Sequence, residues 1–469
     1  MPDIFPFHPP AGAITVGHVI PAIRDGQHGS TETTAIRFWD VEHRAAKGYL
    51  GPTHRTCPPE ETLERIIPLL PLAGITRMAD ITGLDRIGVP VTLAMRPNAP
   101  TLANSSGKGF TRTAAMVSAA MEGIELEFAE DLADSHDDSH RTVLRATYRE
   151  LDRDGLVCPV EHLPLARCST FTAATPEDWI IGFDIAAERP MAVPFAAVGM
   201  GPRARDQSWF SFQTGSNGLA SGNVFLEAVC AGLAEVIERD AVTCAKLRLG
   251  GHLESGTQVG LSAVGYDSVA DLVDRFRRAG VSPVLFDCTA DTAVPTYVAY
   301  LFDDLVPDTG IFRGYGAHLH PEVAAVRALT EAAQSRAVYI AGSRDDLMTL
   351  PHRRMRRTGA SRVMSPTRSA GVALPPPPAA AATFEEDCAA LVAAVRRAGL
   401  EHVIVVDLAP PDLPVSVVRV VVPGLEGYST FLHYAPGPRG RAALRDASPG
   451  LARRNPSGSE TPARERAAR

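Results

Sequence analysis

TGSNGLASGNVFLEAVCAGLAEVIERDA, residues 214–241, is the stretch around which the rest of the chain is organised. It opens with turn-forming Gly, Asn and Ser residues and, from about 221–223, carries apolar residues at helical spacing. At about 100° per residue, the apolar side chains share one side of the predicted helix, and polar and acidic side chains converge on the other within roughly 120°. The apolar set is Leu226, Val229, Leu233, Val236 and Ile237, and the acidic set is Asn223, Glu227, Glu235 and Glu238. The stretch therefore predicts a long helix with a core face and an acidic face.

The acidic face is expected to leave space for a ligand. A solvent-exposed helix usually carries Lys or Arg four residues from its Glu residues, whereas the small side chains of Cys230, Ala231 and Ala234 lie between these carboxylates. Neighbouring carboxylates repel one another unless they bind protons or a cation, and a hard divalent metal ion is the natural partner. Taken alone, the stretch fits an ordinary amphipathic helix with a Glu-rich exposed face equally well.

The same pattern recurs in two other places, which favours the ligand-binding interpretation. Residues 105–109, SSGKG, predict a flexible polar loop before a helix that ends near 130. This helix and a third one, which begins at Pro321, carry polar side chains at a similar helical spacing: Ser118, Glu122 and Glu125 on the first, and Arg327, Glu331 and Gln334 on the second. Lys108 does not belong to a P-loop, because the upstream glycine of that motif is missing and Gly109 stands where Ser or Thr is required.

The composition is that of a globular protein with a large core. The chain has 469 residues, of which 45% are hydrophobic and 21% charged, with a formal net charge of -8 and a pI near 6.0. This charge argues against nucleic acid and anionic membrane surfaces as partners. No stretch has the length of a membrane span, and the first residues lack a basic start followed by an apolar run, so we expect a cytoplasmic protein.

The cysteines and histidines do not indicate a structural zinc site. Seven cysteines are scattered without a C-x-x-C pair, as in reduced proteins, and Cys230 and Cys244 are expected to be small core residues. His136 and His140 lie in a charged segment, 131–149, that favours a solvated loop and helix start over a metal cluster. For His318 and His320 the sequence leaves a turn or capping role and a ligand role open.

Alternating helices and strands predict an α+β fold of mixed sheets with packed helices. Strands are expected within 75–97, 179–186, 191–200, 281–288, 294–303, 402–408 and 417–424, and further helices after Pro58, over 268–279 and over 384–398. The predicted division is a lead-in segment (1–47), a catalytic core (48–352), a disordered Pro- and Ala-rich insertion (353–383), the C-terminal part of the core (384–435) and a disordered tail (436–469). Removal of residues 440–469 is expected to leave the melting temperature nearly unchanged.

The three acidic helices together predict a site for a nucleoside triphosphate with Mg²⁺. Mg²⁺ takes one or two protein carboxylates and completes its octahedron with phosphate oxygens and water. Several carboxylates, accompanied by Arg, Lys, Asn and Gln side chains, exceed what one Mg²⁺ needs. We therefore expect a triphosphate bridged by more than one metal ion, with Lys108 or Arg239 available for phosphate charge. The alternative is a structural network of buried Glu and Arg residues.

These residues resemble those of the YcaO family of ATP-dependent enzymes, which activate peptide backbone amides. The matching text is Lys108, Ser118-x3-Glu122-x2-Glu125, SNGLASGN-x3-Glu227-x7-Glu235-x2-Glu238-Arg239 and RALTEAAQSR, in the family order over about residues 48–435. The resemblance implies a YcaO-type fold with an ATP site between the acidic helices and no P-loop. By position, it implies metal-related roles for Glu122, Glu125, Glu235, Glu238 and Gln334, nucleotide-related roles for Lys108, Ser118, Asn223, Glu227, Arg239, Arg327 and Glu331, and catalytic roles for Glu235, Glu238 and Arg239.

A finer resemblance is to the YcaO subgroup encoded beside TfuA proteins. It is carried by THRTCPPEETLERI (53–66), GITRMADITGLDRIGVPV (74–91), GSRDDL (342–347) and VPGLEG (422–427). It implies replacement of a backbone amide oxygen by sulfur in a peptide or protein substrate, with a TfuA-like partner that delivers the sulfur. The sequence departs from azoline-forming members, because it has no fused E1-like clamp domain and its PPPP run lies internally, at 375–378, in place of a terminal Pro-x-Pro-x-Pro.

The implied reaction takes its nucleophile from outside the chain. A sulfur nucleophile adds to the amide carbon, the oxyanion attacks the γ-phosphate of ATP, and phosphate departs to leave C=S. The sequence contains no convincing Ser-His or Cys-His pair, which agrees with this scheme. Two alternatives remain: a cyclodehydratase that forms an azoline from a substrate Cys, Ser or Thr, and a catalytically silent nucleotide-binding scaffold. A homodimer is also left open.

Overall fold

The chain folds into antiparallel sheets with packed helices, which confirms the predicted α+β class. The computed structural model describes residues 35–132, 143–166, 169–202, 204, 211–261, 265–306, 310–343, 371–379, 381–427 and 434–447. Within these ranges, sheets of six, four and three strands are accompanied by two short hairpins. No helix in the described part of the chain has the length and apolar character needed to cross a membrane.

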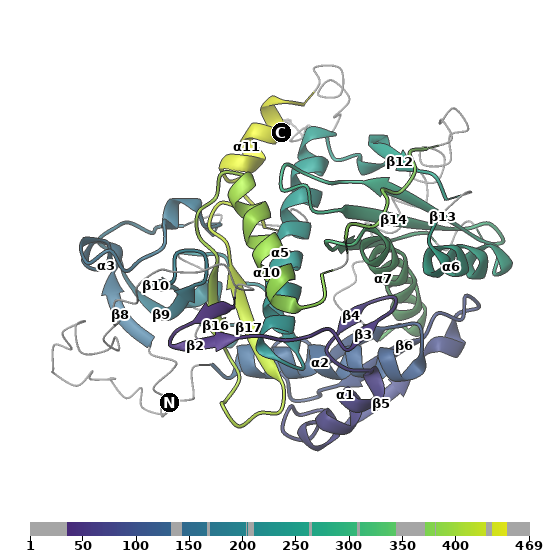
Figure 1. Ribbon diagram of the computed structural model, residues 1–469, viewed down its shortest axis with the longest axis horizontal. Helices are drawn as coiled ribbons and strands as arrows, with labels where there is room; N and C mark the ends of the chain where they lie inside the picture. The colour runs from purple at the N-terminus through teal and green to yellow at the C-terminus, as the bar shows by residue number, and fades with distance from the viewer. Residues whose placement is uncertain are drawn as a thin grey trace, which may run out of the picture.

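The two larger sheets lie on opposite sides of the molecule (Figure 1). The six-stranded sheet has the order β10-β9-β16-β17-β11, with β8 also paired to β9. Its strands are β8 (Val143–Thr147), β9 (Pro176–Asp184), β10 (Arg189–Pro194), β11 (Leu219–Gly222), β16 (Ile404–Asp407) and β17 (Ser416–Val421). The four-stranded sheet runs β12 (Thr257–Val259), β13 (Val281–Asp287), β14 (Thr296–Asp303) and β15 (Ile311–Ala317). The predicted strand containing Pro194 is the edge strand β10, which ends at this proline.

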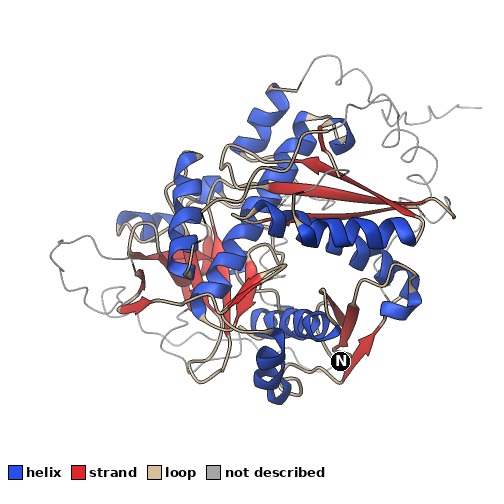
Figure 2. Ribbon diagram, turned by 45° about the vertical axis from the view of Figure 1, so that its right-hand side comes forward, coloured by secondary structure: helices blue, strands red, loops and turns tan. Residues whose placement is uncertain are grey.

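The third sheet consists of β5 (Arg77–Asp80), β6 (Val91–Met95) and β7 (Asn104–Lys108). The helices are α1 (Pro59–Ile66), α2 (Arg112–Glu130), α3 (Tyr148–Arg153), α5 (Phe225–Arg248), α6 (Asp267–Arg278), α7 (Pro321–Ala341), α10 (Phe384–Arg397) and α11 (Pro438–Arg445). Helices α6 and α7 cover one face of the four-stranded sheet, as Figure 2 shows. The short hairpins pair β1 (Ile36–Phe38) with β2 (Val41–His43) and β3 (Tyr49–Leu50) with β4 (His54–Arg55).

Helix α5 is the central element predicted from the sequence. It lies between the two larger sheets and contacts strands of both (Figure 1). Its apolar face is buried as expected, with Leu226 1% exposed and Val229 and Leu233 fully buried. Burial of each such side chain stabilises the fold by about 1.5–3 kcal/mol. The helix begins at Phe225, slightly later than predicted, because Ser221 and Gly222 belong to strand β11.

Three strand-then-helix units, β7–α2, β11–α5 and β15–α7, place a helix directly on strand backbone. A Cβ atom added to Gly107 of β7 would lie 2.0 Å from Ala119 N of α2, and one added to Gly314 of β15 would lie 2.2 Å from Ala332 N of α7. In the central unit, a Cβ on Gly222 would lie 2.5 Å from a backbone nitrogen of α5. Only glycine fits at such contacts. The predicted loop 105–109 is therefore wrong: its small polar residues form most of β7, with which α2 is in close contact.

In the predicted lead-in segment, the described residues 36–47 pack against the rest of the fold. Phe38 of β1 is 8% exposed, and its ring lies 4.5 Å from that of Phe225. The Lys47 ammonium forms an ion pair with Asp387 of α10 at 2.7 Å. Aromatic burial and this buried ion pair attach the hairpin to the start of α5 and to α10.

The predicted disordered regions are ordered in part. Val372 pairs with Val259 of β12, and the Tyr266 hydroxyl donates a hydrogen bond to the carbonyl oxygen of Pro375 at 2.6 Å. In the predicted tail, α11 packs on α5 (Figure 1), so disorder from 436 onward is incorrect. The remainder of both regions, and the pair His136 and His140, lie outside the described residues.

Candidate active site

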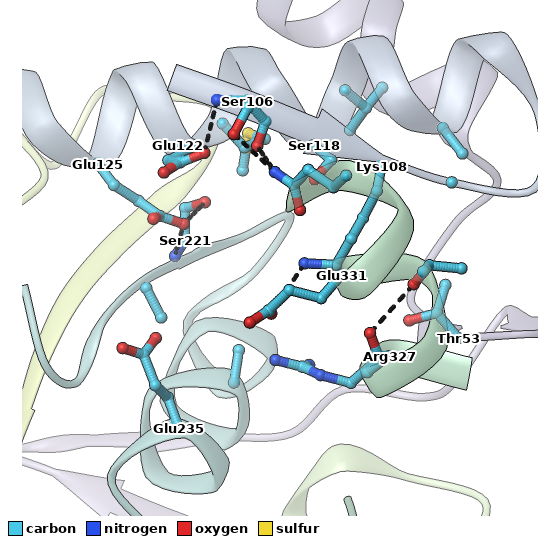
Figure 3. Close-up of a pocket in the computed structure, with 18 of the residues that line it drawn as sticks. Thr53, Ser106, Lys108, Ser118, Glu122, Glu125, Ser221, Glu235, Arg327 and Glu331 are labelled. Carbon is cyan, nitrogen blue, oxygen red and sulfur yellow. Dashed lines mark hydrogen bonds and ion pairs between the residues drawn. The ribbon is translucent and has the colours of Figure 1, made fainter. Parts of the chain in front are cut away.

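The predicted site residues line one cavity of about 850 Å³ between α2, α5 and α7. Figure 3 shows side chains from these helices and from β7 around the same space. A purely structural Glu–Arg network would fill its own volume, whereas here a large cavity remains among the charges. The predicted residues in its wall are Lys108, Ser118, Glu122, Glu125, Asn223, Glu227, Glu235, Glu238, Arg239, Arg327, Glu331 and Gln334.

The first group of carboxylates is held by backbone and hydroxyl donors of neighbouring strands. The backbone N–H of Ser106 donates to Glu122 at 2.9 Å, and the N–H and hydroxyl of Ser221 donate to Glu125 at 2.8 and 2.6 Å. Burial raises the pKa of Glu125 to about 8, against the Ser221 hydrogen bonds and together with the negative charges of Glu122 and Glu235. Glu125 is therefore a carboxyl group that holds a proton or gives it up for a cation.

The second group combines two carboxylates of α5 with one arginine. Burial raises the pKa of Glu238 to about 7, with Arg239 opposing the shift and Glu331 adding to it. The Glu238 carboxylate accepts a hydrogen bond from Ala317 N at 3.0 Å, which ties α5 to the end of β15. Arg239 lies 3.7 Å from both Glu235 and Glu238. The prediction that the acidic face lacks a cation four residues away is thus wrong, since Arg239 follows Glu235 at that spacing.

Lys108 joins β7 to α7 across the cavity. Its ammonium lies 3.2 Å from the Glu331 carboxylate. Burial acts to raise the pKa of Glu331, but the charges of Lys108 and Arg239 outweigh it and the pKa lies below its usual value. Gln334, one turn further along α7, donates from Nε2 to the carbonyl and hydroxyl oxygens of Ser106 at 2.5 and 2.7 Å. These contacts hold α7 at a fixed distance from β7, on which α2 is packed.

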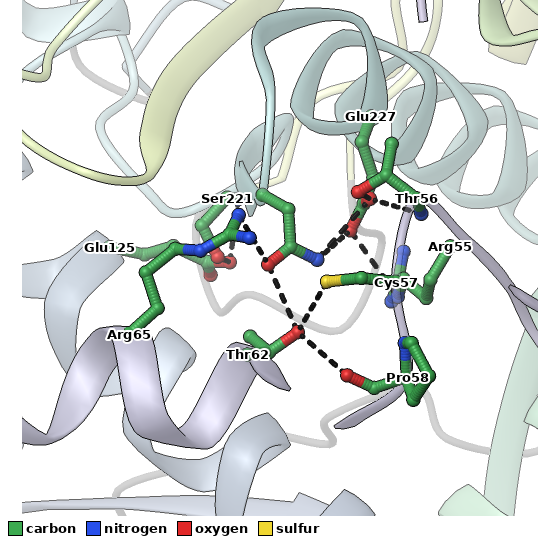
Figure 4. Close-up of polar contacts among 10 residues, drawn as sticks. Arg55, Thr56, Cys57, Pro58, Thr62, Arg65, Glu125, Ser221 and Glu227 are labelled. Carbon is green, nitrogen blue, oxygen red and sulfur yellow. Dashed lines mark hydrogen bonds and ion pairs between the residues drawn. The ribbon is translucent and has the colours of Figure 1, made fainter. Parts of the chain in front are cut away.

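Asn223 and Glu227 are held by residues near the N-terminus of the described chain. Figure 4 shows Thr56 beside Glu227, with Thr62 on α1 nearby. The Thr62 hydroxyl donates to Asn223 Oδ1 at 2.9 Å, and Asn223 Nδ2 donates to Glu227 at 3.2 Å. The N–H and hydroxyl of Thr56 both donate to Glu227 Oε2 at 3.0 Å. Sequence reasoning did not identify Thr56 or Thr62; the only signal was their position within the THRTCPPEET stretch.

Cys230 does not lie between the carboxylates as predicted. It is buried, and its thiol donates to the carbonyl oxygen of Phe384 on α10 at 3.5 Å, on the core side of α5. Its expected role as a small core residue agrees with this position. Cys244 is buried as well.

The histidines before α7 have a turn role. His318 Nδ1 accepts a hydrogen bond from the backbone N–H of His320 at 2.9 Å, so the neutral imidazole carries its proton on Nε2. His54 and Asp387 lie close enough to His318 to suggest a metal cluster. However, the protonated Nε2 offers no lone pair for a metal ion, and Lys47 already neutralises Asp387. The turn interpretation therefore stands in place of the ligand interpretation.

The residues around the cavity fit Mg²⁺ with a triphosphate. Buried carboxylates whose pKa is raised by burial and by one another are stabilised when a cation replaces the protons. Hard carboxylate oxygens are the ligands that Mg²⁺ prefers, and Lys108, Arg239 and Arg327 supply positive charge in the same wall. Such a site defines a class of protein that binds nucleotide between helices without a P-loop.

The chain belongs to the YcaO family. The family model described as YcaO cyclodehydratase, ATP- and Mg²⁺-binding, matches residues 106–426. ATP and Mg²⁺ are accordingly the cofactors, and YcaO enzymes are ATP-dependent modifiers of peptides. The resemblance found in the sequence is confirmed.

Curated relatives and solved structures agree with this assignment. A protein of Rhizobium leguminosarum bv. trifolii, described as an uncharacterised protein in the tfuA 3' region, is 36% identical over 82% of this chain and 91% of its own length. An uncharacterised protein of Methanothermobacter thermautotrophicus is 37% identical over 79% of this chain and 94% of its own. The YcaO structure of Methanopyrus kandleri bound with AMPPCP and Mg²⁺ is 25% identical, with a TM-score of 0.63 over 84% of this chain and 98% of that one. A heterocyclase in complex with substrate and cofactor shares the fold, with a TM-score of 0.69 at 21% identity over 90% of this chain and 59% of that one.

A pH-dependent difference in stability is expected from Glu125. The unfolded chain loses this proton near pH 4.5, and the folded protein keeps it up to about pH 8. In this window the folded state binds more protons than the unfolded state, so the contribution of Glu125 to stability falls as pH rises. Without Mg²⁺, the melting temperature of Glu125→Gln should rise relative to that of the unaltered protein between about pH 6.5 and about pH 8.

Thermal denaturation of both proteins over this range checks the prediction. The buried histidines His54 and His318 do not add to the pH dependence in this range. Burial lowers the pKa of both imidazoles, so they are already neutral above about pH 6.5. Mg²⁺ with ATP should make the melting temperature of the unaltered protein fall less as pH rises, because a cation then replaces the proton of Glu125. A difference between the two melting temperatures that does not change with pH would contradict the assignment of a raised pKa.

Proposed function

We propose that this protein replaces the oxygen of a peptide backbone amide by sulfur, at the expense of ATP and with a TfuA-like protein as sulfur donor. The observation that carries the thioamide assignment is the similarity, over most of both chains, to a protein described as lying in the tfuA 3' region. The stretches at 53–66, 74–91 and 422–427 support it, since they resemble the TfuA-associated subgroup. The substrate is a ribosomally made peptide or a protein, and the reaction takes place in the cytoplasm.

The reaction requires that a poor leaving group become a good one. Hydrosulfide, or a carrier-bound equivalent, adds to the amide carbon, and the oxyanion formed attacks the γ-phosphorus of ATP. This attack displaces ADP. The C–O bond then breaks with release of phosphate while the sulfur loses its proton, which leaves C=S. Mg²⁺, when bound, neutralises charge on the phosphates. For each sulfur atom that enters the peptide, one amide oxygen leaves as part of the released phosphate.

The residues that line the cavity would have two kinds of role, binding of metal ions and binding of the nucleotide. Glu122, Glu125, Glu235, Glu238 and Gln334 would hold the metal ions, and Lys108, Ser118, Asn223, Glu227, Arg239, Arg327 and Glu331 would hold the nucleotide. Among these, Glu235, Glu238 and Arg239 would act nearest the transferred phosphoryl group, because Arg239 lies 3.7 Å from both carboxylates. A fixed cation beside two metal-binding carboxylates stabilises the charge that develops during transfer.

Mass spectrometry of the modified peptide distinguishes the two candidate products. The protein would be co-expressed with a TfuA-like protein and with candidate peptides. Exchange of oxygen for sulfur makes the peptide heavier, and loss of water makes it lighter. We expect a heavier product that requires ATP and a sulfur source and that forms at a residue without a nucleophilic side chain.

The alternative is an azoline-forming cyclodehydratase, which the description of the family model favours. A lighter product that forms only at Cys, Ser or Thr, without added sulfide, would move the protein to that class. Modification without ATP would contradict both functions. A homodimer is compatible with either product, and gel filtration with light scattering would measure it.

A further inference from the structure

The polar contacts that hold Asn223 and Glu227 come from a segment outside the matched part of the family model. That model begins at residue 106, whereas Thr56 directly follows β4 and Thr62 lies in α1. Thr62 contacts Asn223 across a separation of 161 residues in the sequence. The segment therefore contributes to the cavity wall through a contact that the fold must assemble.

The direction of the hydrogen bonds determines which atoms face one another. Thr62 has one hydroxyl proton, and its nearest acceptor is Asn223 Oδ1 at 2.9 Å; the carbonyl oxygen of Pro58 is further, at 3.4 Å. Donation to Oδ1 leaves the Nδ2 amide group of Asn223 pointing to Glu227. With the amide reversed, Asn223 Oδ1 would face the Glu227 carboxylate. Two acceptors would then meet without a donor at a residue that is only 2% exposed, which is unfavourable.

The Glu227 carboxylate is fixed from a second side. Thr56 donates to Oε2 from both its N–H and its hydroxyl, and Arg55 lies 3.6 Å from Oε1. Asn223 and Glu227 are 6% and 2% exposed, and both line the cavity. Each therefore has its orientation set by this segment before any ligand enters, which lowers the cost of ordering side chains on binding.

We propose that Thr56 and Thr62 are positioning residues of the nucleotide site, which act through Glu227 and Asn223, although Thr62 itself also lies in the cavity wall. This inference rests on the proposed nucleotide site and adds to it a part of the chain that the family model does not match. A purely structural role in the first turn of α1 is the competing account, because Thr62 also approaches Pro58 O.

The test compares Mg²⁺-ATP affinity with stability in the full-length protein. Thr62→Val keeps the shape and removes the hydroxyl, so the Kd for ATP measured by calorimetry should rise about tenfold. Thr62→Ser keeps the hydroxyl and should restore the affinity. Thr56→Val, which retains the backbone N–H to Glu227, should show a smaller rise. Thr296→Val is the matched control: this fully buried threonine donates to Val294 O at 3.0 Å, away from the cavity, and its variant should bind ATP normally.

The outcomes separate this inference from the proposed function. A lower melting temperature with unchanged ATP affinity in Thr62→Val would overturn the positioning role and leave a structural one. Failure of Thr62→Ser to restore affinity, or an equal loss in Thr296→Val, would overturn it as well. If Thr62→Val does not fold, Thr56→Val decides in the same way. Absence of Mg²⁺-ATP binding by the unaltered protein would overturn the nucleotide site itself.

Discussion

Replacement of Glu235 or Glu238 by Gln is expected to reduce ATP turnover by about 10²–10³-fold while the protein remains folded. Both carboxylates line the cavity beside Arg239, and removal of one negative charge weakens the binding of a metal ion there. Gln has nearly the same shape, and its amide oxygen can still accept the hydrogen bond that Ala317 N donates to Glu238. ADP release with saturating peptide and sulfur source measures the loss.

Glu64→Gln on α1 is the control, because Glu64 is solvent-exposed and does not line the cavity. Its turnover should be unchanged. Circular dichroism and melting curves establish that the two site variants are folded, and calorimetry with and without Mg²⁺ separates binding from chemistry. Normal ATP turnover in both Glu235→Gln and Glu238→Gln would remove the site assignment.

Loss of the Arg439 side chain is expected to destabilise the protein by about 3 kcal/mol. Arg439 of α11 lies 2.8 Å from the Asp240 carboxylate, whose side chain is completely buried, and 2.5 Å from Asp291. Burial raises the pKa of Asp240, and the hydrogen bond and charge of Arg439 oppose this shift. Arg439→Ala would leave a buried carboxylate without its cation. The free energy of unfolding, from chemical denaturation, measures the effect.

Arg441→Ala is the matched control on the same helix, because Arg441 is exposed and its side chain donates to the carbonyl oxygen of Pro436 in the same segment. Its stability should change by less than about 0.5 kcal/mol.

A chain that ends at 447 keeps α11, whereas removal of residues 440–469 removes the Gly440 N–H that donates to Glu426 at 2.6 Å. The second truncation should therefore lower the melting temperature, contrary to the expectation from the sequence. Equal stability of Arg439→Ala and Arg441→Ala would show that α11 does not stabilise α5.

The periodicity of single helices could be predicted from the sequence because it is a local property. The apolar and acidic faces of α5 lie as predicted, and the acidic faces of α2 and α7 meet it at one cavity. The roles assigned to individual site residues remain predictions. Resemblance to a known family supplied the nucleotide and the metal, which spacing alone gave only as one of two interpretations.

Contacts between distant parts of the chain could not be predicted. Arg439 and Asp240 are 199 residues apart, and nothing local in PGPRGRAALR indicates a docked helix. Residues 104–108 lack the β-branched pattern of a strand, and they form β7 because β6 supplies hydrogen bonds and α2 needs a glycine beneath it. The polarity of these segments suggested solvent exposure, while the tertiary partners that satisfy it lie elsewhere in the sequence.

The glycine contacts beneath α2, α5 and α7 limit how this cavity can change. Because each of these helices lies on strand backbone with no side chain between them, its height above the strand cannot be altered by exchanging one core residue for a larger or smaller one. The distances among the carboxylates are therefore a property of the main chain. Tyr49, Leu102 and Phe110 also line the cavity and are exposed or half-buried, so they form its rim, and none of them takes part in these three glycine contacts. Related proteins that act on different peptides are accordingly expected to differ at this rim while the ATP-binding floor keeps one geometry.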